Sequence, residues 1–172
     1  MENREEKKSQ FTKPKKSTGR TIWILVAVAC IGAGLAFVLG INSVSTERGG
    51  AYVKGENGKI LIPVADISDS KAHYYSYDVG GAAVNFFLLK SSDGVIRAAL
   101  DACDVCYKAL QGYRQEGDFM VCNNCNQQFS SEQINVVKGG CNPAPLTREI
   151  VNGQVELLEH EVRAGIVYFP RS

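Results

Sequence analysis

The sequence predicts a mostly β domain that follows a single amino-terminal transmembrane helix. Three observations predict this arrangement: an uncharged apolar run near the amino terminus, short apolar runs separated by turn dipeptides, and two Cys-x-x-Cys pairs. The chain has 172 residues, of which 45% are hydrophobic and 22% are charged. This composition is ordinary for a globular protein, and the length favours one folded domain.

The uncharged run near the amino terminus predicts a membrane-spanning helix. Residues 22–41 contain no charged or strongly polar side chain. At about 1.5 Å per residue they reach across a hydrocarbon core of about 30 Å. Because backbone amides inside that layer must bond within the segment, the run is expected to be helical. We therefore expect a transmembrane helix over residues 21–42.

Two alternatives exist for this apolar run. A cleaved signal peptide has an apolar stretch of about 7–15 residues and a small-residue cleavage site, whereas this run is longer and offers only a poor site near Gly40. A lipoprotein would carry its lipid on Cys30, but eleven apolar residues follow that cysteine. Cys30 is therefore interpreted as a small apolar residue of the helix.

The charge distribution predicts the orientation of the chain. Residues 1–20 carry seven cations and three acids, a net charge of +4, so the whole-chain value of +1 leaves −3 for residues 21–172. Since cytoplasmic flanks are enriched in Lys and Arg, we expect the basic tail in the cytoplasm and the remainder outside a bacterial inner (cytoplasmic) membrane. The acidic remainder offers no basic surface, so no nucleic-acid partner is expected.

Beyond the span, the chain is expected to form a tether and one folded domain. Residues 43–58 are rich in Gly, Ser and charge and show no hydrophobic period, which is typical of a linker. Residues 59–172 are numerous enough to bury one core of their own. We expect them to form a small extracytoplasmic domain.

Two hairpins are the clearest elements of this domain. Apolar runs at residues 83–89 and 95–100 flank a turn that contains Asp-Gly, which predicts a β-hairpin. Residues 149–151 and 154–158 repeat this pattern around Asn-Gly, a dipeptide that accepts positive φ at both positions.

Three weaker signals complete the assignment of elements. Residues 59–64 and 73–78 are apolar or aromatic runs and are expected to be strands. Residues 130–134 are the one segment that resembles a helix start, with Ser130 placed to cap the first turn.

The predicted domain contains five cysteines, which occur in the sequence as two Cys-x-x-Cys units and one separate cysteine. Cys103 and Cys106 are followed by Cys122 and Cys125 in a C-x2-C-x15-C-x2-C pattern, and Cys141 follows. This spacing is typical of a four-thiolate metal site. Two intervening residues let a tight turn aim both sulfurs at one centre, and two such turns on adjacent hairpins complete a tetrahedron. The first pair directly follows the predicted strand at residues 95–100. The second pair directly follows residues 118–121, which are also expected to be a strand, so each knuckle should lie at a strand end.

The type of donor restricts the metal. Thiolates select iron, zinc or copper and exclude magnesium. Neither pair is followed by histidine, which a c-type haem attachment requires. On count alone, His73 and His160 allow a Rieske-type cluster, but both lie far from the cysteines in sequence. They are interpreted as half-exposed sheet or surface residues.

Disulfide bonding is the alternative to a metal. Five cysteines leave one unpaired, and pairing within a Cys-x-x-Cys unit closes a loop too short to stabilise much by chain entropy. Two other functions therefore stay open beside an iron protein. One is a redox-inactive module that binds zinc or copper, and the other is a thiol-disulfide redox protein.

The segments around the cysteines carry a resemblance to a known family. They are Phe86 to Cys106, Gly112 to Phe119, Cys122 to Cys125, Ile134-Asn135 and Gly139 to Pro145. In this combination, over about residues 60–170, the chain resembles the FtrD-like family of membrane iron-sulfur proteins.

The resemblance implies a function and a set of ligands. It implies a membrane protein that contains an iron-sulfur cluster or mononuclear iron and passes electrons beside an iron permease in bacterial ferrous-iron transport. The ligands that it implies are Cys103, Cys106, Cys122 and Cys125, with Cys141 as a fifth thiolate. No Ser-His-Asp arrangement, P-loop or catalytic carboxylate pair is identified, so we expect an electron carrier or metal-binding protein rather than an enzyme.

Overall fold

The computed structural model describes residues 50–169, and these residues are mostly β, as the sequence predicts. The strands are β1 Ala51–Val53, β2 Gly55–Glu56, β3 Lys59–Pro63, β4 His73–Val79, β5 Ala82–Lys90, β6 Ile96–Leu100, β7 Tyr113–Glu116, β8 Phe119–Cys122, β9 Gln128–Ser130, β10 Arg148–Val151 and β11 Gln154–Leu158. The helical segments are α2 Glu159–Ala164 and the 3₁₀ turns η1 Val64–Ile67, η2 Tyr107–Ala109, η3 Ser131–Gln133 and η4 Gly165–Tyr168.

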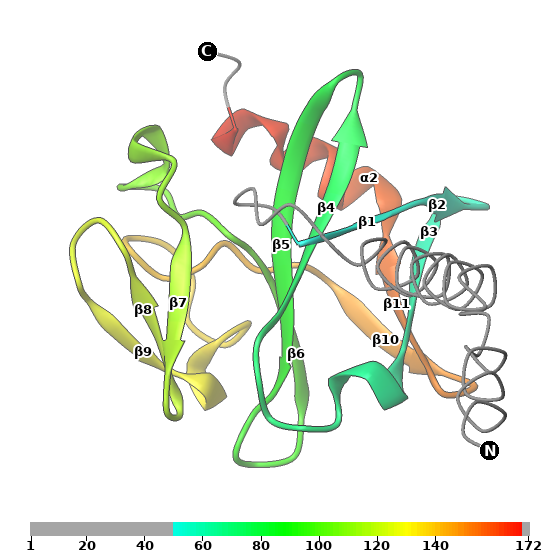
Figure 1. The fold of residues 1–172 in the computed structure, drawn as a ribbon, viewed down its shortest axis with the longest axis horizontal. Coiled ribbons are helices and arrows are strands. Elements are labelled where there is room, and N and C mark those ends of the chain that lie inside the picture. The colour runs from blue at the N-terminus through cyan, green and yellow to red at the C-terminus, as the bar shows by residue number, and fades with distance from the viewer. Residues whose placement is uncertain (1–49, 170–172) are drawn as a thin grey trace, which may run out of the picture. The chain divides into compact units, whose positions relative to one another are not determined.

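These strands form three sheets, in the orders β1-β4-β5-β6, β10-β11-β3-β2 and β7-β8-β9. Figure 1 shows the β7–β9 sheet on one side of β4–β6, and β3, β10 and β11 on the other side. Strands β1 and β2 lie within residues 43–58, which the sequence predicts as a linker, and they pair with β4 and β3.

Strand β5 is central to the domain because both of its faces are buried. Its Phe86 and Leu88 belong to the core shared with the β10-β11-β3-β2 sheet. The alternate residues Phe87 and Leu89 belong to a second core that also contains Cys103 and Cys122. Since successive side chains of a strand point to opposite faces, one nearly continuous apolar run serves both cores.

Both predicted hairpins are confirmed. Strand β5 pairs antiparallel with β6, and Lys90 stands opposite Ile96 across the predicted Asp-Gly turn. Strand β10 pairs antiparallel with β11, and Asn152 and Gly153 have φ values of 49° and 76° at their turn. Positive φ at both central positions is the geometry for which Asn-Gly is preferred.

The predicted helix start at residues 130–134 is wrong in extent. The segment forms only the three-residue turn η3, and Ser130 makes no side-chain capping bond. Ser131 instead donates its hydroxyl hydrogen bond to Asp118, which attaches this turn to the β7–β8 hairpin. The α-helix of the described residues is α2, where Val162 packs into the first core.

Asn135 connects β6 to the segment that carries Cys141. Its side-chain oxygen accepts the N–H of Ala98 at 2.8 Å, and its amide nitrogen donates to the carbonyl oxygens of Ala98 and Leu146 at 2.6 and 3.0 Å. Its φ of 69° is left-handed, a conformation that asparagine adopts more readily than most residues. One side chain therefore bonds to the backbone of β6 and to that of Leu146, where these two segments lie side by side.

The predicted transmembrane helix over residues 21–42 lies outside the described residues. Within residues 50–169, no helix is both long enough and apolar enough to cross a bilayer. The basic tail and its predicted orientation also lie outside this range.

Candidate metal centre

The first cysteine pair lies in a tight turn directly after β6. Cys103 is 1% exposed, and its sulfur accepts the backbone N–H of Cys106 at 3.2 Å. The chain then enters η2, where the N–H of Ala109 donates to the carbonyl of Cys106 at 3.0 Å. The two-residue spacing thus curls the backbone around the first sulfur, as metal-binding knuckles do.

The second pair begins at the last residue of β8. Cys122 is 2% exposed, and its carbonyl accepts the N–H of Asn126 at 2.8 Å. Asn126 has a φ of 60°, which turns the chain back so that the Cys122 N–H donates to Gln127 at 3.0 Å. Cys125 lies at the exposed tip of this turn.

Cys141 comes from a third segment that is fastened to the first knuckle by backbone bonds. The Ala144 N–H donates to Ala102 at 2.9 Å, and the Leu100 N–H donates to Ala144 at 2.7 Å. The hydroxyl of Tyr113 donates to the carbonyl of Cys141 at 2.5 Å. Contacts distant in sequence therefore place this cysteine beside the two pairs.

The structure brings the five thiols together. The Sγ atoms of Cys103, Cys106 and Cys122 lie within 4.8 Å of one another, and so do those of Cys106, Cys125 and Cys141. Cys106 belongs to both groups. The sulfurs of Cys106 and Cys141 are 3.7 Å apart, and all five side chains are free thiols.

This donor set fits iron or an iron-sulfur group. Thiolate is the ligand of iron-sulfur clusters and of tetrahedral zinc and iron sites. A tetrahedron with metal-sulfur bonds of about 2.3 Å has sulfurs about 3.8 Å apart. The Cys106–Cys141 separation of 3.7 Å is close to that edge length. When such a group is bound, it supplies one-electron chemistry, while the protein fixes its ligands and its exposure to water.

Ionisation of the thiols depends on their positions. Burial raises the pKa of Cys122 to about 11. Burial, and then hydrogen bonds to Cys125 and Cys106, raise the pKa of Cys141. Burial also opposes ionisation of Cys125, yet its pKa is lowered because the Gln127 N–H and neighbouring thiols donate to it. A nearby cation would favour the thiolate forms of Cys122 and Cys141.

Polar side chains orient the second knuckle. The amide of Asn124 donates to the sulfur of Cys106 at 3.2 Å. Arg114 on β7 donates to the side-chain oxygens of Asn123 and Asn126 at 3.0 and 3.3 Å. These two bonds attach Arg114 to the turn that carries Cys122 and Cys125. Such outer partners keep metal ligands in place.

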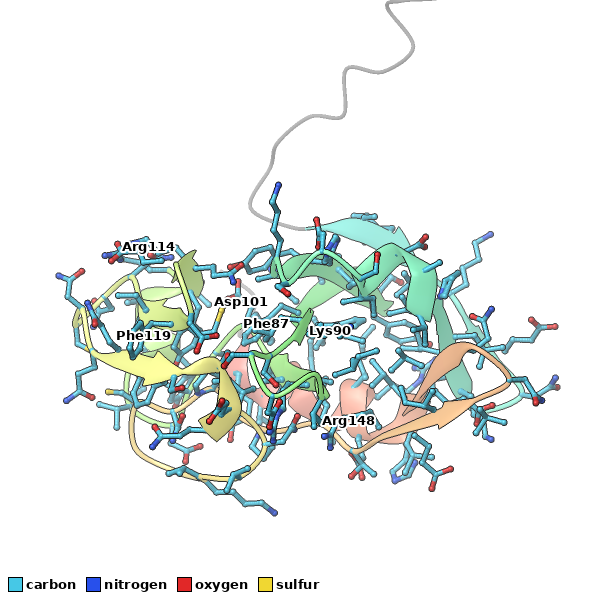
Figure 2. All side chains as sticks on the ribbon, turned by 90° about the horizontal axis from the view of Figure 1, so that it is seen from below. Phe87, Lys90, Asp101, Arg114, Phe119 and Arg148 are labelled. Atoms are coloured by element: carbon cyan, nitrogen blue, oxygen red, sulfur yellow. The ribbon has the colours of Figure 1, made fainter. Side chains whose placement is uncertain are left out.

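Aromatic side chains cover the buried side of the thiols. Tyr113 packs against Phe87 and Phe129, with ring centroids 6.3 and 6.4 Å apart. Phe119, at the start of β8, does not join them and is 44% exposed. Figure 2 shows Phe119 on the part of the domain formed by β7–β9 and Phe87 where that part meets the central strands.

Asp101 is a site residue whose role the sequence did not indicate. Asp101 is half-buried, its carboxylate accepts the N–H of Tyr113 at 2.7 Å, and desolvation raises its pKa to about 7. It lies against Gly112, where an added Cβ would be 2.6 Å from the carboxylate carbon. An Asp between a strand and a cysteine pair is typical of a turn. In the structure, Gly112 and Tyr113 pack against this carboxylate.

The histidines take the surface positions that the sequence predicts. The side chain of His73 is 29% exposed, and its Nε2 lies 2.6 Å from Asp69. His160 is exposed on α2. Neither belongs to the two thiol groups, so the candidate ligands in the described residues are cysteines.

One protein-family match agrees with the cysteine-rich site. Residues 67–169 match the family described as "Membrane iron-sulfur containing protein FtrD-like". No curated protein matches the chain. Among solved structures, the quaternary ammonium Rieske monooxygenase CntA in complex with an inhibitor is similar, with a TM-score of 0.39 and 16% identity. The match covers 58% of this chain and 30% of that one.

The family match extends over more than half of the chain and includes the five clustered cysteines. The chain therefore belongs to the FtrD-like family of membrane iron-sulfur containing proteins.

Proposed function

We propose that this protein is a membrane-anchored iron-sulfur or iron protein that transfers electrons or handles iron in bacterial ferrous-iron transport. The observation that carries the proposal is the convergence of five thiols, two buried and one exposed, in a member of an iron-sulfur family. The proposed ligands are Cys103, Cys106, Cys122, Cys125 and Cys141.

The graded burial of the thiols supports electron transfer. Cys103 and Cys122 lie in the second core, where they share neighbours with Phe87. Cys125 stands at the exposed tip of its turn. A metal held by these groups is shielded from water on one side and lies close to the surface on the other. An electron carrier needs both features, because shielding tunes its potential and the open side receives its partner.

The position of the domain in the cell is part of the proposal. The predicted span over residues 21–42 and the basic tail before it support a single-pass protein with a cytoplasmic amino terminus. The domain then lies outside the cytoplasmic membrane. Its proposed partner is an iron permease or another electron-transfer protein of that membrane.

Absorption spectroscopy of the full chain, purified anaerobically in detergent, tests this proposal. We expect a coloured protein whose visible absorption bleaches on reduction and returns on reoxidation. The exchange Cys30→Ser, outside the cysteine-rich domain, serves as the control and is expected to leave the spectrum unchanged. A colourless protein with stoichiometric zinc or copper would instead indicate a redox-inactive binding module. A metal-free protein with titratable disulfides would indicate a thiol-disulfide protein.

A further inference from the structure

The two thiol groups share one cysteine, and this sharing bears on how many metal ions the centre holds. Cys103, Cys106 and Cys122 form an inner group, and Cys106, Cys125 and Cys141 form an outer group. Every thiol of the described residues belongs to at least one group. A single tetrahedral ion would use four of the five and leave one without a role.

The contacts of Cys106 are those of a bridging ligand. Its sulfur lies 3.7 Å from that of Cys141 in the outer group and within 4.8 Å of Cys103 and Cys122 in the inner group. It also accepts a hydrogen bond from Asn124 at 3.2 Å. The half-buried Cys106 thus stands between the buried thiols of the inner group and the exposed Cys125.

We infer that the centre holds two metal ions joined by the thiolate of Cys106. The inner ion is bound by Cys103, Cys106 and Cys122, and the outer ion by Cys106, Cys125 and Cys141. Each tetrahedral ion then lacks one ligand, and a single bridging sulfide fills both places. This inference rests on the proposed function, because it specifies the iron centre that the function requires.

The number of ligands gives the composition of the centre. Four thiolates bind one ion each and Cys106 binds both, so six of the eight positions of two tetrahedral ions come from the protein. One sulfide supplies the remaining two. The expected composition is two irons and one acid-labile sulfide per chain. A cluster of two irons and two sulfides would need only four cysteines.

Metal and sulfide analysis of the full chain tests the inference. We expect two irons and one sulfide per chain, with a low-temperature spin-resonance spectrum of two coupled ions. Cys141→Ser removes a ligand of the outer ion alone, so about one iron per chain should remain and the coupling should disappear. The control Cys30→Ser should keep both irons.

The other outcomes separate this inference from the proposed function. One iron per chain in the unaltered protein, unchanged by Cys141→Ser, would overturn the two-ion centre and leave the iron protein standing. A content of two irons and two sulfides per chain that Cys141→Ser leaves unchanged would also overturn the Cys106-bridged centre and leave the iron protein standing. Absence of metal from the unaltered protein would contradict the proposed function itself. Circular dichroism of the variant shows whether the domain is folded.

Discussion

Cys106→Ser is expected to lower the metal content of the purified protein at least about tenfold. Cys106 is the one thiol that both groups share, so its loss leaves neither group with three thiols. Loss of an outer hydrogen-bond partner alone typically lowers metal affinity about 10- to 100-fold, and loss of a shared ligand should cost more. Metal analysis after anaerobic purification measures this effect.

The same variant should loosen the cysteine-rich part of the domain. In the proposed centre, a bound metal would connect the knuckle after β6 to the knuckle after β8. Without the metal, only side-chain and backbone contacts would hold the two knuckles together. Limited proteolysis should therefore cut the variant faster around residues 103–125 than it cuts Cys30→Ser. Full metal content in Cys106→Ser would show that the cluster of thiols is not the binding site.

Gly112→Ala is expected to lower the free energy of unfolding by about 2–4 kcal/mol. A left-handed φ costs a non-glycine residue about 1 kcal/mol or more, and overpacking a buried contact costs about 1–3 kcal/mol. The φ of Gly112 is 60°, and a Cβ there would overlap the carboxylate of Asp101. Displacing Asp101 also weakens its bond to the N–H of Tyr113. Denaturant unfolding followed by circular dichroism measures the loss.

Gly117→Ala provides the matched control for this prediction. Gly117 has a φ of 58°, but no atom lies within 4 Å of the Cβ position. Gly117→Ala should therefore lower the free energy of unfolding only by the cost of a left-handed φ for alanine, about 1 kcal/mol. Equal losses in the two variants would show that contact with Asp101 contributes nothing to stability.

Local patterns predicted much of the fold. The Asp-Gly and Asn-Gly turns fix their hairpins through neighbouring residues, and β5–β6 and β10–β11 form as expected. The two Cys-x-x-Cys turns are likewise local, and each lies at the end of a strand. Where a turn and its flanking apolar runs lie within about twenty residues, the sequence contains most of the information needed.

Features that depend on distant contacts could not be predicted in this way. Strand β1 forms by parallel pairing with β4, and nothing within residues 51–53 indicates that partner. Cys141 joins the cluster through bonds between its own segment and Ala102. Ser130 was a reasonable cap for a helix, but the bond from Ser131 to Asp118 ties that segment to the β7–β8 hairpin instead. In each case a tertiary contact outweighs the local preference.

The environment of the thiols was also beyond a sequence pattern. The spacing indicates four ligands, whereas the structure gathers five and assigns Cys106 to two groups. The burial of Asp101 and the role of Arg114 in holding the second turn depend on side chains from other strands. Cysteine spacing predicts that a site exists, and the packing of neighbouring strands determines its composition.

X-ray absorption at the iron edge is the most direct test of the central claim that these thiols hold iron. The sample is the full chain purified anaerobically in detergent. We expect iron whose nearest neighbours are all sulfur, at about 2.3 Å. Nearest neighbours of nitrogen or oxygen, or a protein without iron, would contradict the account.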